Sequence, residues 1–189
     1  KQEGGVKFSD HRVTSPLANI DRTCQTCHRQ DAEVLKQNVY ERQAKTRESR
    51  TKLEKQLAAA HIEAKFAWEK GATEAEMKPI LQLIRSSQWR WDYAFASHGA
   101  SFHAPQEVQR LFSDGLVQVQ DARLMLSKVL AKHGFIGDVP MPDISTKAKA
   151  QEYIGLDMKT LREKKQRFLQ EIEPKWIEEA KKNGKLIEI

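Results

Sequence analysis

The longest run of residues without a helix breaker extends from Asp31 to Lys70, where the chain has neither glycine nor proline. A continuous helix over these roughly 40 residues would be about 60 Å long, because each residue adds about 1.5 Å. Such a helix is longer than a small domain, so we expect it to lie against another long helix, in this chain or in a second copy. Apolar residues recur along it at spacings of three, four and multiples of seven, namely Leu35, Val39, Leu53, Leu57, Ala60, Ala64 and Ala67.

Glycines, prolines and capping residues divide the rest of the chain into further helices. Thr73–Glu76 has the pattern of a capping box, although Pro79 favours a regular helix that begins only there and ends at His98. The sequence predicts three more helices, over 105–132, 145–154 and 158–172, and a kink at Pro174. Residues 1–23 look irregular, and no strand is predicted. We therefore expect an all-α protein in three segments of one domain: a loop-rich segment 1–30, long helices in 31–134, and a linker with C-terminal helices in 135–189.

The composition argues against several classes of partner. The 189 residues carry a formal net charge of +6, the pI is about 9.3 and the mean hydropathy is −0.68. Charges of both signs are spread along the chain, without the basic stripe and interleaved aromatic residues typical of nucleic-acid binding. No apolar run approaches the roughly 18 residues of a membrane-spanning helix. The chain also has no initiating methionine and no signal-peptide core, which suggests a fragment or a processed product.

The strongest chemical signal is Cys24-Gln25-Thr26-Cys27-His28, the attachment pattern of a c-type haem. Cys24 and Cys27 are the only two cysteines of the chain. Each thiol forms a thioether to one vinyl group of the porphyrin, and two intervening residues let both sulfurs reach the same edge of the ring. His28 then lies under the ring as the proximal ligand of the iron.

Three other interpretations of this pentapeptide compete with haem attachment. A structural zinc site needs four ligands, usually from a second Cys/His pair at similar spacing, and no second pair exists here. A thioredoxin-like redox pair belongs in a βαβ pattern, whereas the surrounding sequence looks helical and loop-like. A chance occurrence in a haemless helical interaction module remains as a third hypothesis.

The other histidines are weaker candidates for iron ligands. His11 lies in a predicted loop, where most histidines are simply solvated. His98 and His103 flank a glycine break before a helix that starts with proline, and either could cap a helix or project onto an iron. His61 falls on the apolar side of the long helix, which favours a packed core residue. His133 precedes Gly134 and is typical of a helix C-terminal cap.

With these residues in view, the chain resembles the periplasmic ammonia-forming cytochrome c nitrite reductases, specifically their C-terminal half. The resemblance covers essentially the whole chain and is carried by a joint order of motifs. The stretch from Gln88 to Pro105 is the most specific of them. The motifs are Ser9–His11, Cys24–His28, Ala72–Pro79, Gln88–Asp92, Ala96–Gly99, His103–Pro105 and Pro142–Lys147.

The resemblance implies a long-helix multihaem cytochrome c architecture and the six-electron reduction of nitrite to ammonium at a lysine-ligated haem. It implies that Cys24, Cys27 and His28 hold the last haem of the chain. His11 and His103, the latter in preference to His98, would be distal ligands of two other haems. The catalytic haem motif, the catalytic residues and the calcium ligands of the family are absent, so no catalytic residue is expected in this chain.

The leading hypothesis is therefore the electron-relay and dimerisation half of a periplasmic nitrite reductase that is inactive alone. Its implied partners are an N-terminal catalytic half, a second copy in a homodimer and a periplasmic or membrane-anchored cytochrome as electron donor. The alternative is a free-standing monohaem c-type protein that transfers electrons without catalysis. It needs its own sixth iron ligand, for which His103 and His98 are the candidates.

Overall fold

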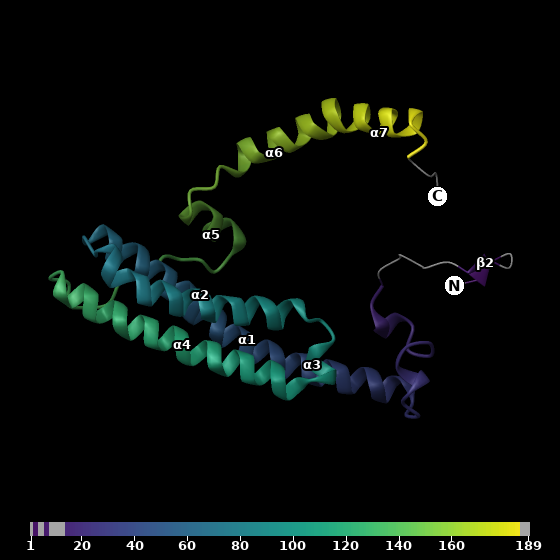
Figure 1. Ribbon diagram of the computed structural model, residues 1–189, viewed down its shortest axis with the longest axis horizontal. Helices are drawn as coiled ribbons and strands as arrows, with labels where there is room; N and C mark the ends of the chain where they lie inside the picture. The colour runs from purple at the N-terminus through teal and green to yellow at the C-terminus, as the bar shows by residue number, and fades with distance from the viewer. Residues whose placement is uncertain (1, 4–5, 8–13, 186–189) are drawn as a thin grey trace. The chain divides into compact units, whose positions relative to one another are not determined.

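Three long helices form the main body of the protein. The computed structural model describes residues 2–3, 6–7 and 14–185, and the chain divides into two compact units, 1–139 and 140–189. The first unit contains α1 (Ala32–Glu69), α2 (Glu74–Ala96), the one-turn helix α3 (Ala100–His103) and α4 (Pro105–Lys132). The helices α1, α2 and α4 lie side by side (Figure 1). The predicted all-α fold class is confirmed.

The N-terminal segment has more local order than its sequence indicates. Two short strands, β1 (Gln2–Glu3) and β2 (Val6–Lys7), pair antiparallel. Two 3₁₀ turns follow, η1 (Pro16–Ala18) and η2 (Cys24–Thr26). The expectation of no strand was wrong at β1 and β2, because two-residue strands are too short to produce an alternating pattern.

Helix α1 ends in a glycine-dependent cap. Gly71 has a φ of 92°, a conformation that side chains disfavour. The Gly71 N–H donates to the Trp68 carbonyl and the Ala72 N–H donates to the Ala67 carbonyl, both at 3.0 Å. This is a Schellman motif, and it turns the chain back so that α2 can pack against α1.

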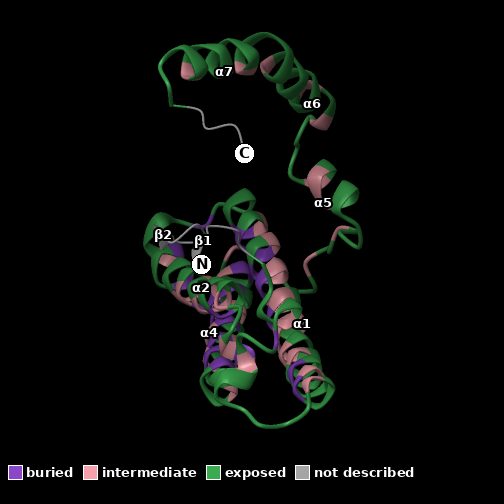
Figure 2. Ribbon diagram, turned by 90° about the vertical axis from the view of Figure 1, so that its right-hand side faces the viewer, coloured by how far each residue is buried: buried purple, intermediate pink, exposed green. Residues whose placement is uncertain are grey.

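The core lies where α4 packs along both α1 and α2. Apolar residues from all three helices become inaccessible to water there, which is the main favourable contribution to folding. Figure 2 shows buried residues on these helices and none on the helices of the second unit. The largest fully buried side chains are Leu53, Met77, Ile80, Leu126, Val108, Val119 and Ser87.

Gly115 lies where α4 contacts both α1 and α2. A Cβ on Gly115 would lie 3.0 Å from Leu53 Cδ2 and 3.5 Å from Ser87 Oγ. The buried Ser87 hydroxyl donates a 2.7 Å hydrogen bond to the Gly115 carbonyl. The absence of a side chain at Gly115 therefore lets α4 pack closely, which offsets the low helix propensity of glycine.

The predicted start of α2 at Pro79 was wrong, because the helix begins at Glu74 and continues through the proline. Thr73 Oγ1 accepts a hydrogen bond from the Glu76 N–H, while the Glu76 carboxylate accepts one from the Thr73 N–H. This capping box organises the first turn before the chain reaches Pro79. Pro79 and Ala75 are exposed, so water can solvate the Ala75 carbonyl that lacks its usual donor.

Glu76 also joins the start of α2 to the end of α4. Its carboxylate lies 3.0 Å from His133 Nε2 and forms an ion pair with Lys132 Nζ. These contacts, with those from Thr73, hold the pKa of Glu76 well below its ordinary value of 4.5. His133 therefore does more than cap α4, because it reaches a second helix.

We expect the Glu76 carboxylate to make the free energy of unfolding depend on pH in the acidic range. A carboxyl whose folded-state pKa is depressed stabilises the fold above its ordinary pKa, and this contribution is lost as pH falls through the folded-state value. Glu76→Gln should therefore lower the urea midpoint at pH 7, and the deficit should shrink progressively below about pH 4.5. Glu74→Gln, two residues earlier in the same turn and exposed, is the control. A deficit that stayed constant down to pH 3 would contradict this account.

The second unit consists of α5 (Lys147–Tyr153), α6 (Met158–Arg167), a π-helical turn η3 (Phe168–Ile172) and α7 (Glu173–Lys182). The disturbance expected at Pro174 takes the form of this π turn, which precedes the proline. None of the described residues of this unit is buried. The division into segments 1–30, 31–134 and 135–189 stays a prediction.

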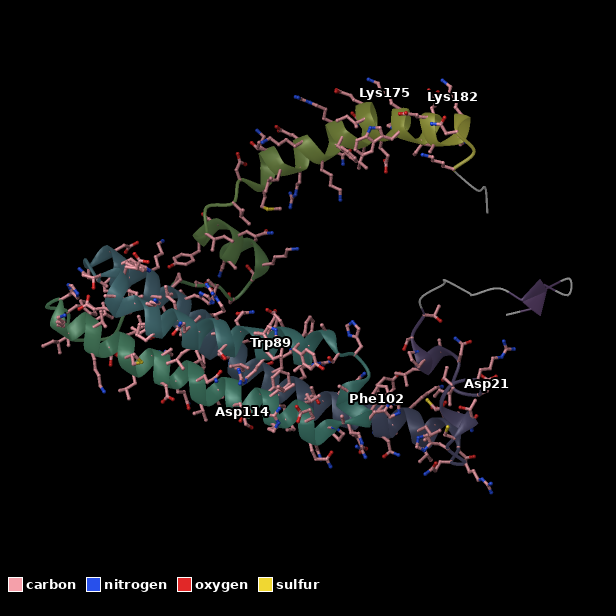
Figure 3. All side chains as sticks on the ribbon, viewed as in Figure 1. Asp21, Trp89, Phe102, Asp114, Lys175 and Lys182 are labelled. Atoms are coloured by element: carbon pink, nitrogen blue, oxygen red, sulfur yellow. The ribbon has the colours of Figure 1, made fainter. Side chains whose placement is uncertain are left out.

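One residue lies differently from its predicted position. His61 is exposed rather than packed in the core, because Ala60 and Ala64 occupy the buried line of α1. Trp89, labelled in Figure 3, is 58% exposed and stacks on Tyr93. None of the described helices is long and apolar enough to cross a membrane.

Candidate haem-attachment site

The two cysteines lie on a single turn that the preceding residues fix in place. Thr23 Oγ1 donates hydrogen bonds to the carbonyls of Asn19 (2.7 Å) and Pro16 (3.0 Å). The Gln25 N–H donates to the carbonyl of Ile20, whose side chain is only 5% exposed. A buried apolar residue and a network of local hydrogen bonds therefore hold the start of η2.

Backbone hydrogen bonds within the motif bring its three chemical groups together. The carbonyl of Cys24 accepts from the N–H groups of Cys27 (3.2 Å) and His28 (2.9 Å). Thr26 Oγ1 donates to the Thr23 carbonyl at 2.6 Å. One turn thus carries both thiols and the imidazole, and three residues separate His28 from the start of α1 at Ala32.

The residues fit a covalently attached haem. Both cysteines are free thiols; Cys24 is partly exposed and Cys27 is exposed. His28 is exposed as well, so its imidazole is not committed to the protein interior. Thr23 Oγ1 lies 3.7 Å from Cys24 Sγ, and Thr26 Oγ1 lies 3.9 Å from Cys27 Sγ.

The structure describes His98 and His103, two of the other candidate iron ligands. His98 and His103 are both exposed, on either side of the Gly99 break. The His103 ring makes an edge contact with Phe102, at 4.7 Å between centroids. Neither imidazole makes a hydrogen bond to another described residue, so both are available to a ligand. His11 lies outside the described residues.

A protein-only metal site is not found in the part of the chain that the structure describes. Within residues 2–3, 6–7 and 14–185, no three His, Cys, Asp or Glu side chains come together in a way that could hold a metal ion. Cys24, Cys27 and His28 share one turn of the backbone, but their side chains do not form such a group.

The helical fold and the CxxCH turn together define a c-type cytochrome. The family model for cytochrome c552 matches residues 1–185, and the chain belongs to the cytochrome c552 family. Relatives named cytochrome c-552 include those of Bacteroides thetaiotaomicron (67% identical over 186 residues), Porphyromonas gingivalis (62% over 185) and Bacteroides fragilis (61% over 189). The alignments cover 98–100% of this chain but only 37–38% of each relative.

These names correct the predicted assignment to the nitrite reductases. The family and the relatives are called cytochrome c552 or c-552, and none of the names describes a nitrite reductase or another enzyme. The predictions of an enzyme and of its electron-relay half are replaced by membership of the cytochrome c552 family. A cytochrome c family implies haem c, whereas the calcium and the additional haems implied by the resemblance have no support in these comparisons.

Proposed function

We propose that this chain carries one haem c and takes part in electron transfer without itself catalysing a reaction. The observation that carries this proposal is the single turn on which Cys24, Cys27 and His28 lie, with both thiols free. Membership of the cytochrome c552 family supports it independently. A bound haem supplies the one-electron chemistry of its iron.

Each of the three residues of the turn would bind the haem in a different way. Cys24 and Cys27 would hold the haem by thioether bonds, which do not dissociate. His28 would offer an imidazole nitrogen to the iron, since its side chain is exposed and its backbone N–H is held by the Cys24 carbonyl. A second protein ligand on the opposite face would leave no open position on the iron, which favours electron transfer over catalysis.

A peptide mass and a redox titration test the proposal together. The tryptic peptide that contains Cys24–His28 should carry the added mass of one haem. The intact protein should show a Soret band and a reversible one-electron transition. An unmodified peptide from protein made in a host that attaches haem c would overturn the proposal. The same preparation gives the number of haems per chain.

The second axial ligand is proposed to be His103, with His98 as the weaker candidate. Both side chains are exposed and without a hydrogen bond to another described residue. The resemblance prefers His103 to His98 only as a distal ligand of a haem attached elsewhere, and it gives His11 the same role. For His103 that assignment is the alternative to ligating the haem on Cys24 and Cys27. We expect His103→Ala to convert a low-spin haem spectrum to a high-spin one and His98→Ala to leave it unchanged. The opposite pattern would assign the ligand to His98.

Location and partners follow from the same proposal. Haem c is attached outside the cytoplasm, which favours a periplasmic protein with a periplasmic or membrane-anchored cytochrome as electron donor. A second copy is proposed to cover exposed apolar residues of the second unit, because helices without a buried face gain little stability alone. The exposed apolar residues of the second unit include Leu161, Leu169, Ile172, Trp176 and Ile177. Light scattering that showed only a monomer would contradict the dimer.

A further inference from the structure

A cavity of about 250 Å³ lies between α1 and the junction of α2 with α3. Its lining includes two arginines of α1, Arg47 and Arg50, together with Phe95, His98 and Ser101. No aspartate or glutamate is among its described lining residues. The space corresponds to the liquid volume of about eight water molecules, so a small molecule would fit inside it.

Arg50 packs against an aromatic ring, but one of its nitrogen atoms has no hydrogen-bond partner among the described residues. Its guanidinium lies over the ring of Phe95, with Cζ 4.8 Å from the ring centroid. Its Nε atom is buried and has no hydrogen-bond partner among the described residues. Glu54 Oε1 lies 3.0 Å from this nitrogen, but it is not aligned with the N–H and accepts a hydrogen bond from Trp91 Nε1. The ion pair therefore leaves donor capacity on Arg50 unused.

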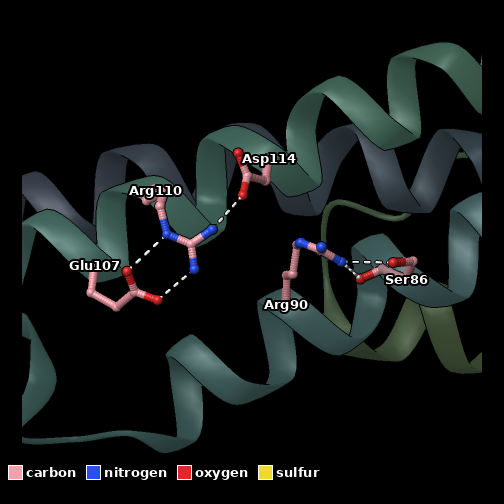
Figure 4. Close-up of polar contacts among 5 residues, drawn as sticks. All are labelled: Ser86, Arg90, Glu107, Arg110 and Asp114. Carbon is pink, nitrogen blue, oxygen red and sulfur yellow. Dashed lines mark hydrogen bonds and ion pairs between the residues drawn. The ribbon is translucent and has the colours of Figure 1, made fainter.

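Arg47 has even fewer partners, one turn earlier on the same helix. It makes no hydrogen bond or ion pair with another described residue. Figure 4 shows two arginines with more partners: Arg110 pairs with Glu107 and Asp114, and Arg90 donates through Nη1 to Ser86, although its Nε is buried without a partner as well. Arg47, which is exposed, and Arg50, which is paired with Glu54, both line a cavity whose described lining contains no carboxylate.

The hydroxyl of Ser101 adds a neutral donor to the same wall. Ser101 is only 8% exposed, and its side chain makes no hydrogen bond to another described residue. Its hydroxyl oxygen is not fully buried, so a ligand or water in the cavity can reach it. Two guanidinium groups and a hydroxyl form the donor set that recognises carboxylate and phosphate oxygens.

We propose that this cavity binds a small oxyanion, held between Arg47 and Arg50. Two sources share the required chemistry: a free anion from solution, or a propionate of a bound haem. The proposal goes beyond the electron-transfer function, because a free anion would bind whether or not the iron changes its oxidation state.

Calorimetric titration of the haem-loaded chain with inorganic phosphate, and separately with acetate, tests for a free anion. Binding in low-salt buffer should weaken at least tenfold in Arg47→Gln and in Arg50→Gln. Arg50→Lys, which keeps the charge but loses the fork, should bind with intermediate affinity. Arg42→Gln is the matched control, since Arg42 is an exposed arginine of α1 outside the cavity lining. Far-UV circular dichroism confirms that each variant is folded.

Resonance Raman spectra of the same proteins test for a haem propionate. If a propionate occupies the cavity, the wild type should not bind phosphate, and the Arg47→Gln/Arg50→Gln double variant should shift the propionate bending mode while Arg42→Gln leaves it in place. Either result supports the oxyanion site and identifies its occupant. No anion binding in the wild type together with an unchanged Raman spectrum of the double variant would overturn the proposal.

Discussion

Replacing Cys24 and Cys27 together by serine removes all covalently bound haem from this chain. The expectation is absolute because the sequence contains no other cysteine, and a thioether cannot form from a serine hydroxyl. The measurement is haem staining of a denaturing gel, which detects only covalent haem, combined with the mass of the intact protein. The wild type should stain and carry the added mass, and the double variant should do neither.

The matched control is Gln25→Ala, which changes the same turn but keeps both thiols. Gln25 donates a side-chain hydrogen bond to the Gln30 carbonyl, at 3.0 Å, so its loss should loosen the turn slightly without preventing attachment. Haem staining that persisted in the double cysteine variant would show that the haem is bound elsewhere. The interpretation of η2 as the attachment turn would then be wrong.

Leu53→Ala should lower the free energy of unfolding by about 2–5 kcal/mol, the range for a large-to-small change in a core. Leu53 is 0% exposed and lies at the point where α4 approaches α1 through Gly115. The close packing of three helices there leaves little room for the surrounding structure to collapse into the cavity. Urea denaturation followed by circular dichroism measures the effect.

Leu124→Ala makes the same chemical change on the surface and serves as the control. Leu124 is 56% exposed on α4, so its truncation should change stability by less than about 0.5 kcal/mol. Equal effects of the two variants would mean that the packing around Leu53 does not limit stability. The comparison therefore separates burial from the intrinsic preference of leucine for helices.

The long helices could be predicted because their signals are local. A run without glycine or proline, together with Gly71, predicts α1 to within a residue at each end. The start of α2 could not be predicted as well, since the position of Pro79 conflicts with the capping box at Thr73–Glu76. The outcome depended on the exposure of Ala75, which leaves its carbonyl open to water. Exposure of this kind is a property of tertiary packing.

The candidate sites could likewise be predicted only in part. The CxxCH pattern predicts the turn directly, because both cysteines and the histidine lie within five residues. The cavity beside Arg47 and Arg50 was missed, since residues 41–55 have the composition of a solvated helix face. Only the packing of Arg50 on Phe95 distinguishes this arginine from its exposed neighbours, which include Arg47. A spacing of three between two arginines is too common to have indicated it.

The position of the core along α1 has a consequence for how the protein loses its structure. The core cluster begins at Leu53 on this helix, whereas η2 lies before its first residue. About 20 residues of α1 separate its first residue, Ala32, from Leu53, which is about 30 Å of helix at 1.5 Å per residue. Amide hydrogens near Leu53 should therefore exchange far more slowly than those near Ala32, and fraying at the haem end need not be a global event. A haem spectrum and a helix signal followed in the same denaturation would then report two separate transitions.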